Sequence, residues 1–304
     1  LINNIWDFTG GDKMYLYPNN RKIFVNIWDT VANPKGVIQI IHGMSEYGAR
    51  YEQFAHYFNL KGYIVIANDH YGHNNSVEAY FGELPKEGFK IFAEDELFIT
   101  NYINEVYKLP IHILGHSMGS FITQYLMLKD SNFINSYTLL GSNYTRNLKT
   151  YMGSKFINFL SVFRKKKQDF FIDKLMFGNF NDRFEKRTKF DWLSKNMRNV
   201  DDYINDPNCG QIYPTLFYKS FVSTIYNLNI SSEFQNISNK RNILILSGAS
   251  DPVGLYSKGV LRLKSFFESN NYNVEFKLYN SLRHELLHED EKVEVYEKIL
   301  NFIE

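Results

Sequence analysis

The sequence predicts an α/β fold with a mostly parallel central sheet flanked by helices. Three observations predict it. Short runs rich in β-branched and aromatic residues recur along the chain and are bounded by turn formers, as strands are. Several runs are apolar throughout, which is typical of strands that helices cover on both faces. Longer segments with a helical spacing of apolar residues separate most of these runs.

The predicted elements alternate in chain order. The strands are predicted at KIFVNIW (22–28), VIQIIHG (37–43), YIVIAND (63–69), IHILGHS (111–117), SYTLLGS (136–142), NILILSG (242–248) and VEFKLYN (274–280). The helices are predicted at residues 50–61, 89–108, 118–129, 255–270 and 290–303.

The alternation stops in residues 145–228, which contain no strand-like run. This segment includes YMGSKFINFLSVF (151–163), whose larger apolar side chains fall on one helical face. Those side chains are Met152, Phe156, Phe159, Leu160 and Phe163. We therefore expect a helical cap at 145–228, inserted over the C-terminal edge of the sheet, with residues 1–144 and 229–304 forming the core.

Composition narrows the class of protein. With 304 residues, 44% of them hydrophobic, the chain can bury the core of one large domain with an insertion. A net charge of +1 gives no overall attraction to nucleic acid, although residues 145–228 carry a surplus of seven positive charges. The single cysteine, Cys209, excludes an internal disulfide or a cysteine-based zinc cluster and is expected to be inert packing.

The compartment is predicted from what the sequence lacks. No apolar stretch reaches the roughly 18 residues of a membrane-spanning helix, and the start, LINNIWDFTGGDK, lacks the order of a signal peptide. We expect a cytoplasmic protein. The many aromatic residues of the cap beside RKKK (164–167) leave peripheral membrane contact open, with a solvated lysine run as the alternative. Nucleic-acid binding is not expected.

One short motif carries the chemistry. ILGHSMGSF (113–121) places Ser117 in a Gly-x-Ser-x-Gly turn between a predicted strand and a predicted helix. That context is typical of a nucleophile elbow, in which the hydroxyl is exposed at the edge of the sheet. Gly115 and Gly119 provide the clearance for the tight turn. The alternative is an ordinary turn flanked by glycines.

A serine nucleophile needs a base and a group that orients the base. In this topology an acid and then a histidine follow the serine, each on a loop after a later strand. Asp251 in GASDPVG and His284 in SLRHELLHE meet both conditions. Each has a plain alternative, an Asp-Pro turn former and a helix-start residue. His288 is the weaker candidate for the base, and His116 is expected to pack or hydrogen-bond beside the nucleophile.

The negative charge of a tetrahedral intermediate must be met by backbone N–H groups. We expect one donor to be the amide of Met118, which follows the nucleophile. The second is expected at Met44, in the loop HGMSEYG (42–48) after a predicted strand. A simple strand-to-helix turn is the alternative for this loop.

The chain resembles the monoacylglycerol lipase and lysophospholipase family of serine α/β-hydrolases, the hydrolase-4 group. The likeness rests on HGMSEYGARY (42–51), NDHYGHNNS (68–76), GHSMGS (115–120), DDYINDPNCG (201–210), GASDPVG (248–254) and RHELLHE (283–289). It implies an α/β-hydrolase fold, Ser117, Asp251 and His284 as a catalytic triad, the amides of Met44 and Met118 as oxyanion donors, and a cap that shapes an acyl-chain pocket.

The chain departs from the family's usual pattern at four positions. It has Ser45 and Tyr47 where the family usually has glycine and histidine, Tyr71 where the family has arginine, and Ser120 where the family has a third glycine. None of these removes a triad member. Because Tyr47 and Tyr71 change the polar wall on the alcohol side, the family's recognition of glycerol is not carried over.

The sequence thus predicts a serine hydrolase that cleaves carboxylic esters of single-chain acyl lipids, monoacylglycerol or lysophospholipid, through an acyl-enzyme. No metal or organic cofactor is required. The alternatives are a general carboxylesterase or thioesterase on the same triad, and a non-catalytic binding protein with the same fold. Acyl length, head group and oligomeric state stay open.

Overall fold

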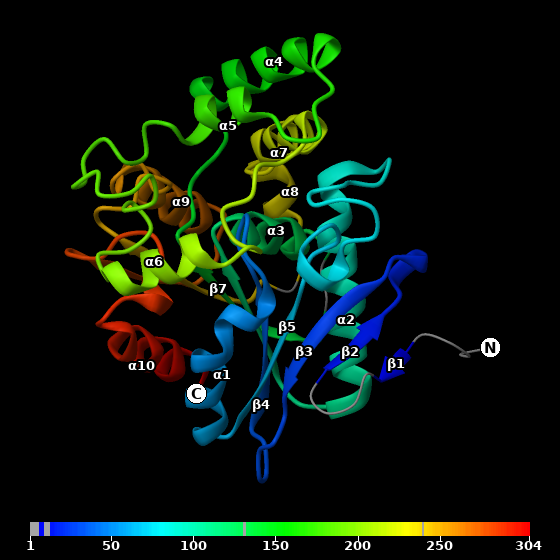
Figure 1. The fold of residues 1–304 in the computed structure, drawn as a ribbon. Coiled ribbons are helices and arrows are strands. Elements are labelled where there is room, and N and C mark those ends of the chain that lie inside the picture. Colours follow the sequence, from blue (N-terminus) through cyan, green and yellow to red (C-terminus); the bar gives the residue numbers. More distant parts are fainter. Residues whose placement is uncertain (1–5, 9–12, 130–131, 239) are drawn as a thin grey trace.

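The computed structural model describes residues 6–8, 13–129, 132–238 and 240–304. Part of LINNIWDFTGGDK, on which the expectation about a signal peptide rests, and the first residues of the predicted core lie outside the described residues. The described chain forms a central sheet with helices on both faces (Figure 1). The α/β prediction is confirmed.

The described strands form one nine-stranded sheet in the order β1-β2-β3-β5-β4-β6-β7-β8-β9. Their bounds are β1 (Trp6–Phe8), β2 (Lys13–Leu16), β3 (Ile23–Trp28), β4 (Gly36–Ile41), β5 (Tyr63–Asn68), β6 (Ile111–His116), β7 (Ile134–Leu140), β8 (Asn242–Gly248) and β9 (Val274–Tyr279). Pairing is antiparallel from β1 to β5 and parallel from β5 to β9. The sheet is therefore mostly parallel, as predicted.

The sequence did not predict strands β1 and β2. They have only three and four residues and form the antiparallel end of the sheet. Neither strand has the continuous apolar run of the inner strands, and in β2 buried side chains alternate with more exposed ones. The pairing of β1 with β2 and of β2 with β3, rather than their own composition, makes them strands.

The helices are α1 (Glu52–Leu60), α2 (Ile91–Tyr107), α3 (Met118–Met127), α4 (Leu148–Phe163), α5 (Phe170–Phe177), α6 (Met197–Asn205), α7 (Thr215–Tyr226), α8 (Ser231–Gln235), α9 (Lys258–Ser269) and α10 (Lys292–Ile303). The five helices predicted for the core are all present, with ends shifted by up to three residues. Residues 145–228, all of which are described, contain α4 to α7 and no strand.

Apolar side chains of the inner strands pack into two layers, one on each face of the sheet. In β4, Val37 and Ile41 belong to the layer of α2, α3 and α9, whereas Ile38 and Ile40 belong to that of α1 and α10. This two-sided burial explains why the inner strands are apolar throughout. The loops after β4, β6, β8 and β9 leave the same edge of the sheet, because these strands run parallel.

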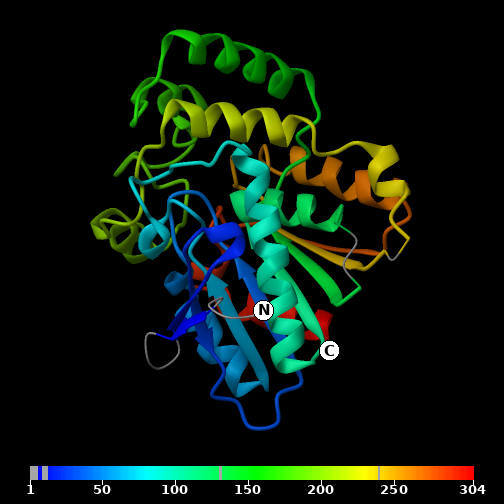
Figure 2. The ribbon, with the colours of Figure 1, turned by 90° about the vertical axis from the view of Figure 1, so that its right-hand side faces the viewer.

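We call residues 145–228 the cap segment; its division from the core at these boundaries stays a prediction. Figures 1 and 2 show α4, α5 and α7 together at the top of the molecule. Helix α4 is the outermost of the three and packs on α7. The cap segment thus lies over one edge of the sheet.

Helix α4 turns its apolar stripe outward. Phe159 is 61% exposed and Phe163 is 75% exposed, whereas Ser154, Ile157 and Ser161 on the opposite face are buried. This side of α4 approaches α7 through hydrogen bonds from Ser154 and Asn158 to the hydroxyl of Ser223. The spacing predicted an apolar face correctly, but the usual expectation that such a stripe packs inward does not hold here.

Gly119 lets α3 start directly against the sheet. A β-carbon at Gly119 would overlap the carbonyl oxygen of Ile41, at the end of β4. The helix that follows Ser117 and the strand that leads to Met44 therefore approach each other more closely than any side chain would allow.

We predict that Gly119→Ala lowers the free energy of unfolding by about 1 to 3 kcal/mol, because the added methyl must push α3 away from β4. Gly153→Ala is the matched control, since nothing lies within 4 Å of a β-carbon there, and its position inside α4 should make alanine stabilising by about 0.5 to 1 kcal/mol. Urea unfolding measures both variants. Equal stability of the two would contradict the close approach.

Candidate active site

Ser117 occupies the sharp turn between β6 and α3. Its backbone has φ 52° and ψ −118°, a conformation that costs a residue with a side chain on the order of 1 to 3 kcal/mol. The turn is held by the N–H of Ser117, which donates to the carbonyl of Leu140 at 2.9 Å. The predicted elbow geometry is present, with the hydroxyl-bearing residue at the end of an inner strand.

Asp251 and His284 meet beside this turn. Asp251 follows β8 and is fully buried, and its Oδ2 lies 3.0 Å from Nδ1 of His284, which follows β9. Asp251 Oδ1 accepts the N–H of Val253 at 2.8 Å, so both carboxylate oxygens are fixed. With a proton on Nδ1, the other ring nitrogen of His284 is an acceptor.

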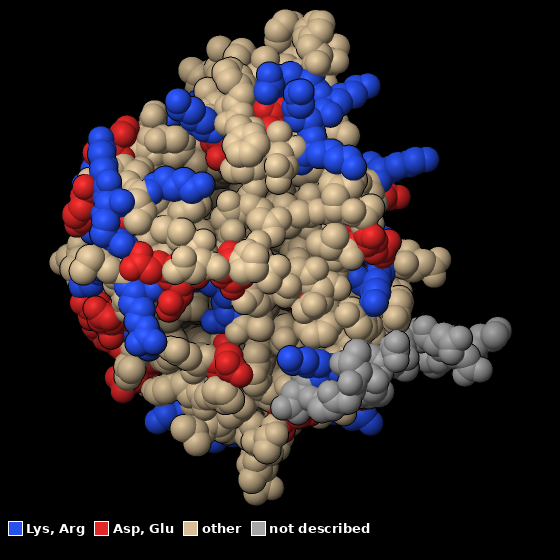
Figure 3. Space-filling view, in the orientation of Figure 1, with Lys and Arg blue, Asp and Glu red and all other residues tan. Residues whose placement is uncertain are grey.

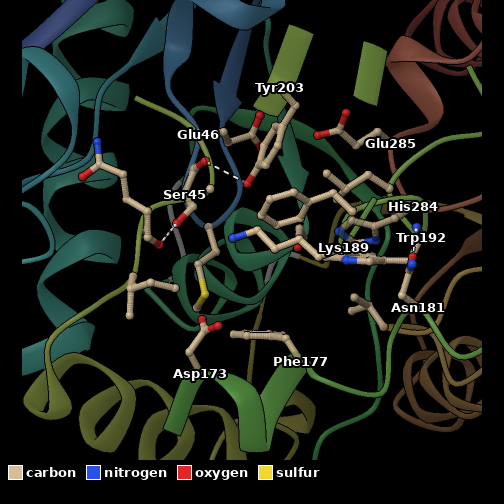
Figure 4. A pocket seen from close by; sticks show the side chains of 18 of the residues that line it. Ser45, Glu46, Asp173, Phe177, Asn181, Lys189, Trp192, Tyr203, His284 and Glu285 are labelled. Carbon is tan, nitrogen blue, oxygen red and sulfur yellow. Dashed lines mark hydrogen bonds between the residues drawn. The ribbon is translucent and has the colours of Figure 1, made fainter. Parts of the chain in front are cut away.

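Ser117 and His284 line one cavity of about 290 Å³. Within the described residues, no hydrogen bond joins their side chains, so the structure brings the two into one cavity without the final contact. The ring of Trp192 lies 5.1 Å from that of His284 and forms a wall of the cavity (Figure 4). Phe177 forms another part of the wall.

The loop after β4 leaves the amide of Met44 available. The N–H of Gly43 donates to Oε1 of Glu46 at 2.6 Å, and the N–H of Ser45 donates to the hydroxyl of Tyr213 at 2.7 Å. Among the described residues, the N–H groups of Met44 and Met118 have no hydrogen-bond partner. A β-carbon at Gly43 would lie 3.2 Å from that of Ser117, so this loop runs directly past the serine.

A buried charge cluster, absent from the sequence prediction, connects the loops. The guanidinium of Arg50 donates to Glu46 Oε2 at 2.7 Å and to both oxygens of Glu285 at 2.8 and 3.0 Å. Asn199 of α6 also donates to Glu285 at 2.6 Å. Since Glu285 is the neighbour of His284, the cluster joins the Met44 loop, the His284 loop and the cap segment.

The charges in this cluster shift one another's pKa values. Burial favours neutral Glu285, but the Arg50 charge outweighs it and lowers the pKa of Glu285 to about 2. Burial likewise opposes ionisation of Glu46, yet its hydrogen bond to His116 and the nearby Arg50 hold its pKa well below the usual value. The same bond, His116 Nδ1 to Glu46 Oε1 at 2.9 Å, raises the pKa of His116 against the effect of burial.

The structure also places the other residues that the sequence analysis named. His116 hydrogen-bonds to Glu46, as expected for a residue that supports the nucleophile. His288 lies in the 3₁₀ turn Leu286–His288, and burial lowers its pKa to about 4. Cys209 is buried, and burial raises its pKa, so its thiol stays protonated. The thiol is thus a poor nucleophile, in line with the sequence expectation.

Two further features bear on ligands and membranes. In the part of the chain that the structure describes, no three His, Cys, Asp or Glu side chains gather in a way that could hold a metal ion. None of its helices is both long and apolar enough to span a bilayer.

Comparison with known proteins identifies a family whose pattern this chain matches. Residues 32–291 match the family Hydrolase_4, described as serine aminopeptidase, S33. The match spans the Ser117 turn, the cap segment and both loops that carry Asp251 and His284.

Individual relatives match over a shorter part. The monoglyceride lipase of Mus musculus is 34% identical over 107 residues, which is 34% of this chain and 34% of the mouse protein. The monoacylglycerol lipase of Mycolicibacterium smegmatis is 33% identical over 104 residues, covering 33% of this chain and 35% of the relative. The matched part thus spans about a third of the length of these relatives.

Solved structures match over nearly the whole chain. A thermostable carboxyl esterase from Bacillus coagulans, in complex with glycerol, superposes with a TM-score of 0.88 and 26% identity, covering 96% of this chain and 97% of the esterase. A monoglyceride lipase from Saccharomyces cerevisiae, bound to a substrate analog, has a TM-score of 0.75 and 18% identity over 98% of this chain and 95% of the lipase. The likeness to the yeast lipase, at 18% identity, shows that the two chains share a fold.

We predict that Arg50→Met lowers the free energy of unfolding by about 3 to 5 kcal/mol at pH 7, because it leaves two buried carboxylates without their cation. Arg187→Met is the control: its partner Asp201 is exposed, so its loss should cost less than about 1 kcal/mol. Urea unfolding at a series of pH values measures both.

The pH dependence follows from the depressed pKa of Glu285. The Arg50 interaction stabilises the fold fully above the unfolded carboxyl pKa of about 4.3 and is lost as pH falls toward the folded pKa of about 2. The gap between wild type and Arg50→Met should therefore shrink below pH 4. A gap that is constant from pH 7 to pH 3 would contradict this account.

Proposed function

Since this chain belongs to the Hydrolase_4 family, we propose that it is a serine hydrolase that cleaves carboxylic esters of single-chain acyl lipids. The observation that carries the proposal is one cavity that contains Ser117, on a strained turn, and His284, whose Nδ1 lies 3.0 Å from Asp251. That arrangement suits nucleophilic catalysis by an alcohol.

The proposed reaction has two halves. His284 takes the proton of Ser117 as its Oγ attacks the ester carbonyl, and Asp251 stabilises the imidazolium that forms. The amides of Met44 and Met118 donate to the oxyanion. The imidazolium then protonates the leaving alcohol, and the same histidine activates water to release the fatty acid from Ser117. Apart from the ester and the water, every group in these steps belongs to the chain.

Single-chain lipids fit the walls of the cavity. Phe177, Phe190, Trp192 and Leu193 contribute apolar surface for an acyl chain. The monoglyceride lipases among the relatives support this substrate class, as does a phospholipase of Bacillus subtilis, 32% identical over 99 residues. We leave the head group open between glycerol and a phosphorylated alcohol.

The structure gives one reason not to assume glycerol. The hydroxyl of Tyr47, where the family usually has histidine, donates to Oδ2 of Asp206 in the cap segment at 2.7 Å. That hydroxyl is therefore already engaged and does not lie free for a substrate alcohol.

A general carboxylesterase is the second candidate. It is favoured by the esterase from Bacillus coagulans, whose fold matches over nearly the full length. An esterase of that kind would prefer short acyl groups, so a series of nitrophenyl esters from two to sixteen carbons separates the two candidates. A peptide anilide in the same series tests the aminopeptidase activity that the family description names.

We predict that Ser117→Ala lowers kcat by on the order of 10⁴ or more and abolishes labelling by a fluorophosphonate probe, because the nucleophile is gone while the fold remains. The assay is a hydrolysis panel of monoacylglycerols and lysophospholipids. Ser161→Ala is the matched control, since its hydroxyl donates only to the carbonyl of Asn158 within α4. A Ser117→Ala variant that retained most of its activity would refute the assignment.

We also propose that the cap segment contacts an anionic lipid surface. An exposed apolar surface covers α4 and α5, which we call the α4–α5 surface. Its side chains are Leu148, Met152, Phe156, Phe159, Val162, Phe163, Phe170, Phe171 and Leu175. Large exposed apolar patches on a protein usually mark a contact with a partner or a membrane.

Charge favours a lipid surface as the partner. Lys165, Lys166 and Lys167 are exposed at the end of α4, beside the α4–α5 surface. Figure 3 shows Lys and Arg gathered over the upper part of the molecule, where α4 and α5 lie. Apolar side chains flanked by lysines match the boundary of an anionic bilayer, where the apolar groups enter and the ammonium groups meet the head groups.

We predict that the double variant Phe159→Ser, Phe163→Ser binds vesicles of phosphatidylcholine and phosphatidylserine at least about tenfold more weakly than wild type, because each phenylalanine contributes about 1 to 2 kcal/mol on burial. Leu60→Ser, Val106→Ser is the matched control, since both side chains are exposed and lie outside the cap segment, on α1 and α2. Vesicle sedimentation measures binding. Equal losses in the two variants, or no binding by wild type, would oppose the proposal.

A further inference from the structure

Ser45 is held in an unfavourable conformation by the cap segment. Its φ of 55° lies in the left-handed region that favours glycine. The hydroxyl of Ser45 donates to the carbonyl of Gln211 at 2.6 Å, and its N–H donates to the hydroxyl of Tyr213 at 2.7 Å. Its carbonyl accepts from the N–H of Gly210 at 3.1 Å and from the hydroxyl of Tyr203 at 3.0 Å (Figure 4). Every polar group of Ser45 thus bonds to residues 203–213.

The hydroxyl of Tyr213 has a second buried partner that fixes its orientation. It lies 2.6 Å from Nε2 of His73, whose Nδ1 lies 3.1 Å from the carbonyl of Tyr71. A carbonyl only accepts, so Nδ1 carries the proton and Nε2 is an acceptor. Tyr213 therefore donates to His73 and, in turn, accepts the N–H of Ser45.

Tyr213 itself is rigidly held. It is 1% exposed, its ring stacks on Phe217 at 3.9 Å, and its carbonyl accepts the N–H of Asp169 at 3.0 Å. Burial raises the pKa of Tyr213 and lowers that of His73 to about 3, so the donor stays protonated and the acceptor stays neutral at working pH. The hydroxyl is a fixed point against which Ser45 is positioned.

We propose that Tyr213 is a positioning residue that aims the amide of Met44 at the oxyanion. Glu46 holds the N–H of Gly43 on one side of Met44, and Tyr213 holds the N–H of Ser45 on the other. Met44 lies between these two fixed N–H groups and lines the same cavity as Ser117, so fixing its neighbours also limits the direction of its own N–H. The inference rests on the proposed function, because it assigns a support for the oxyanion site of the same reaction.

Tyr213→Phe tests the proposal by removing one hydroxyl. The substrate is nitrophenyl acetate, whose short acyl group makes little contact with the cap segment. Complete loss of an oxyanion donor costs about 10²- to 10³-fold in kcat, so a donor that is misplaced rather than lost should cost about 10- to 100-fold. KM should stay within about twofold. The inhibition constant of an alkyl trifluoromethyl ketone should rise in parallel with the fall in kcat/KM, since its hemiketal oxyanion occupies the same site.

Tyr107→Phe is the control, because it also removes one tyrosine hydroxyl. The hydroxyl of Tyr107, on α2, donates to Oδ2 of Asp29 at 3.1 Å and bonds neither to the Met44 loop nor to Tyr213. Tyr218 is unsuitable, because its hydroxyl accepts the N–H of Tyr213 at 3.3 Å. The kcat of Tyr107→Phe should stay within about twofold of wild type. The proposal is overturned if Tyr213→Phe leaves kcat unchanged, if it raises KM alone, or if Tyr107→Phe loses as much kcat.

A second pair of variants changes His73, which accepts the hydrogen bond of the Tyr213 hydroxyl. This pair tests the proposal if Tyr213→Phe does not fold. His73→Gln keeps an acceptor for the Tyr213 hydroxyl and should retain most of the activity, whereas His73→Leu has none and should lower kcat without changing KM. Equal activity of the two would also overturn the proposal.

The substrate proposal can fail separately. An enzyme that cleaves nitrophenyl acetate but not monoacylglycerols or lysophospholipids disproves the lipid assignment and still tests Tyr213. An enzyme that cleaves no ester and takes up no fluorophosphonate disproves both.

Discussion

The site depends on one buried guanidinium. Arg50 is 10% exposed and lies between two carboxylates that are each 2% exposed, Glu46 and Glu285. Removing such charges from water costs several kcal/mol per ion, and only close, multiple hydrogen bonds repay it. Here they tie together three segments that are far apart in the chain. Because Glu285 adjoins His284 and Glu46 holds both Gly43 and His116, a change in this cluster reaches every part of the proposed machinery at once.

Two strained residues show what that rigidity supports. Ser117 and Ser45 both have positive φ without being glycine, at a cost on the order of 1 to 3 kcal/mol each. Such conformations persist only where the surroundings determine them. Ser117 is held at the end of a strand and by the close approach of Gly43. Ser45 is held by hydrogen bonds to the cap segment. Hydrogen-bond donors stabilise an oxyanion most when they are already in place and need not move during the reaction. The strained backbone and the contacts that hold it therefore serve the same purpose.

The sequence predicted most of the fold and the proposed triad because both depend on local patterns. Apolar runs marked the inner strands, and the Gly-x-Ser-x-Gly turn marked Ser117. The rest depends on distant partners. Arg50 and Glu285 are 235 residues apart, and nothing in either segment indicates the other, although both lie in motifs on which the family resemblance rests. Periodicity likewise showed that α4 has an apolar face but could not show which way it points, since only α7 decides that.

Hydrogen bonds to the Met44 loop divide the cap segment into two parts. The hydroxyls of Ser45 and Tyr47 both bond to residues 206–211. Movement of that stretch would break these bonds and release the loop that carries Met44. Among the described residues, no hydrogen bond joins α4 or α5 to this loop, and these two helices carry the exposed apolar surface. The two parts are nevertheless connected, because the N–H of Asp169, at the start of α5, donates to the carbonyl of Tyr213 at 3.0 Å. Displacement of α5 would therefore loosen the residue against which Ser45 is positioned.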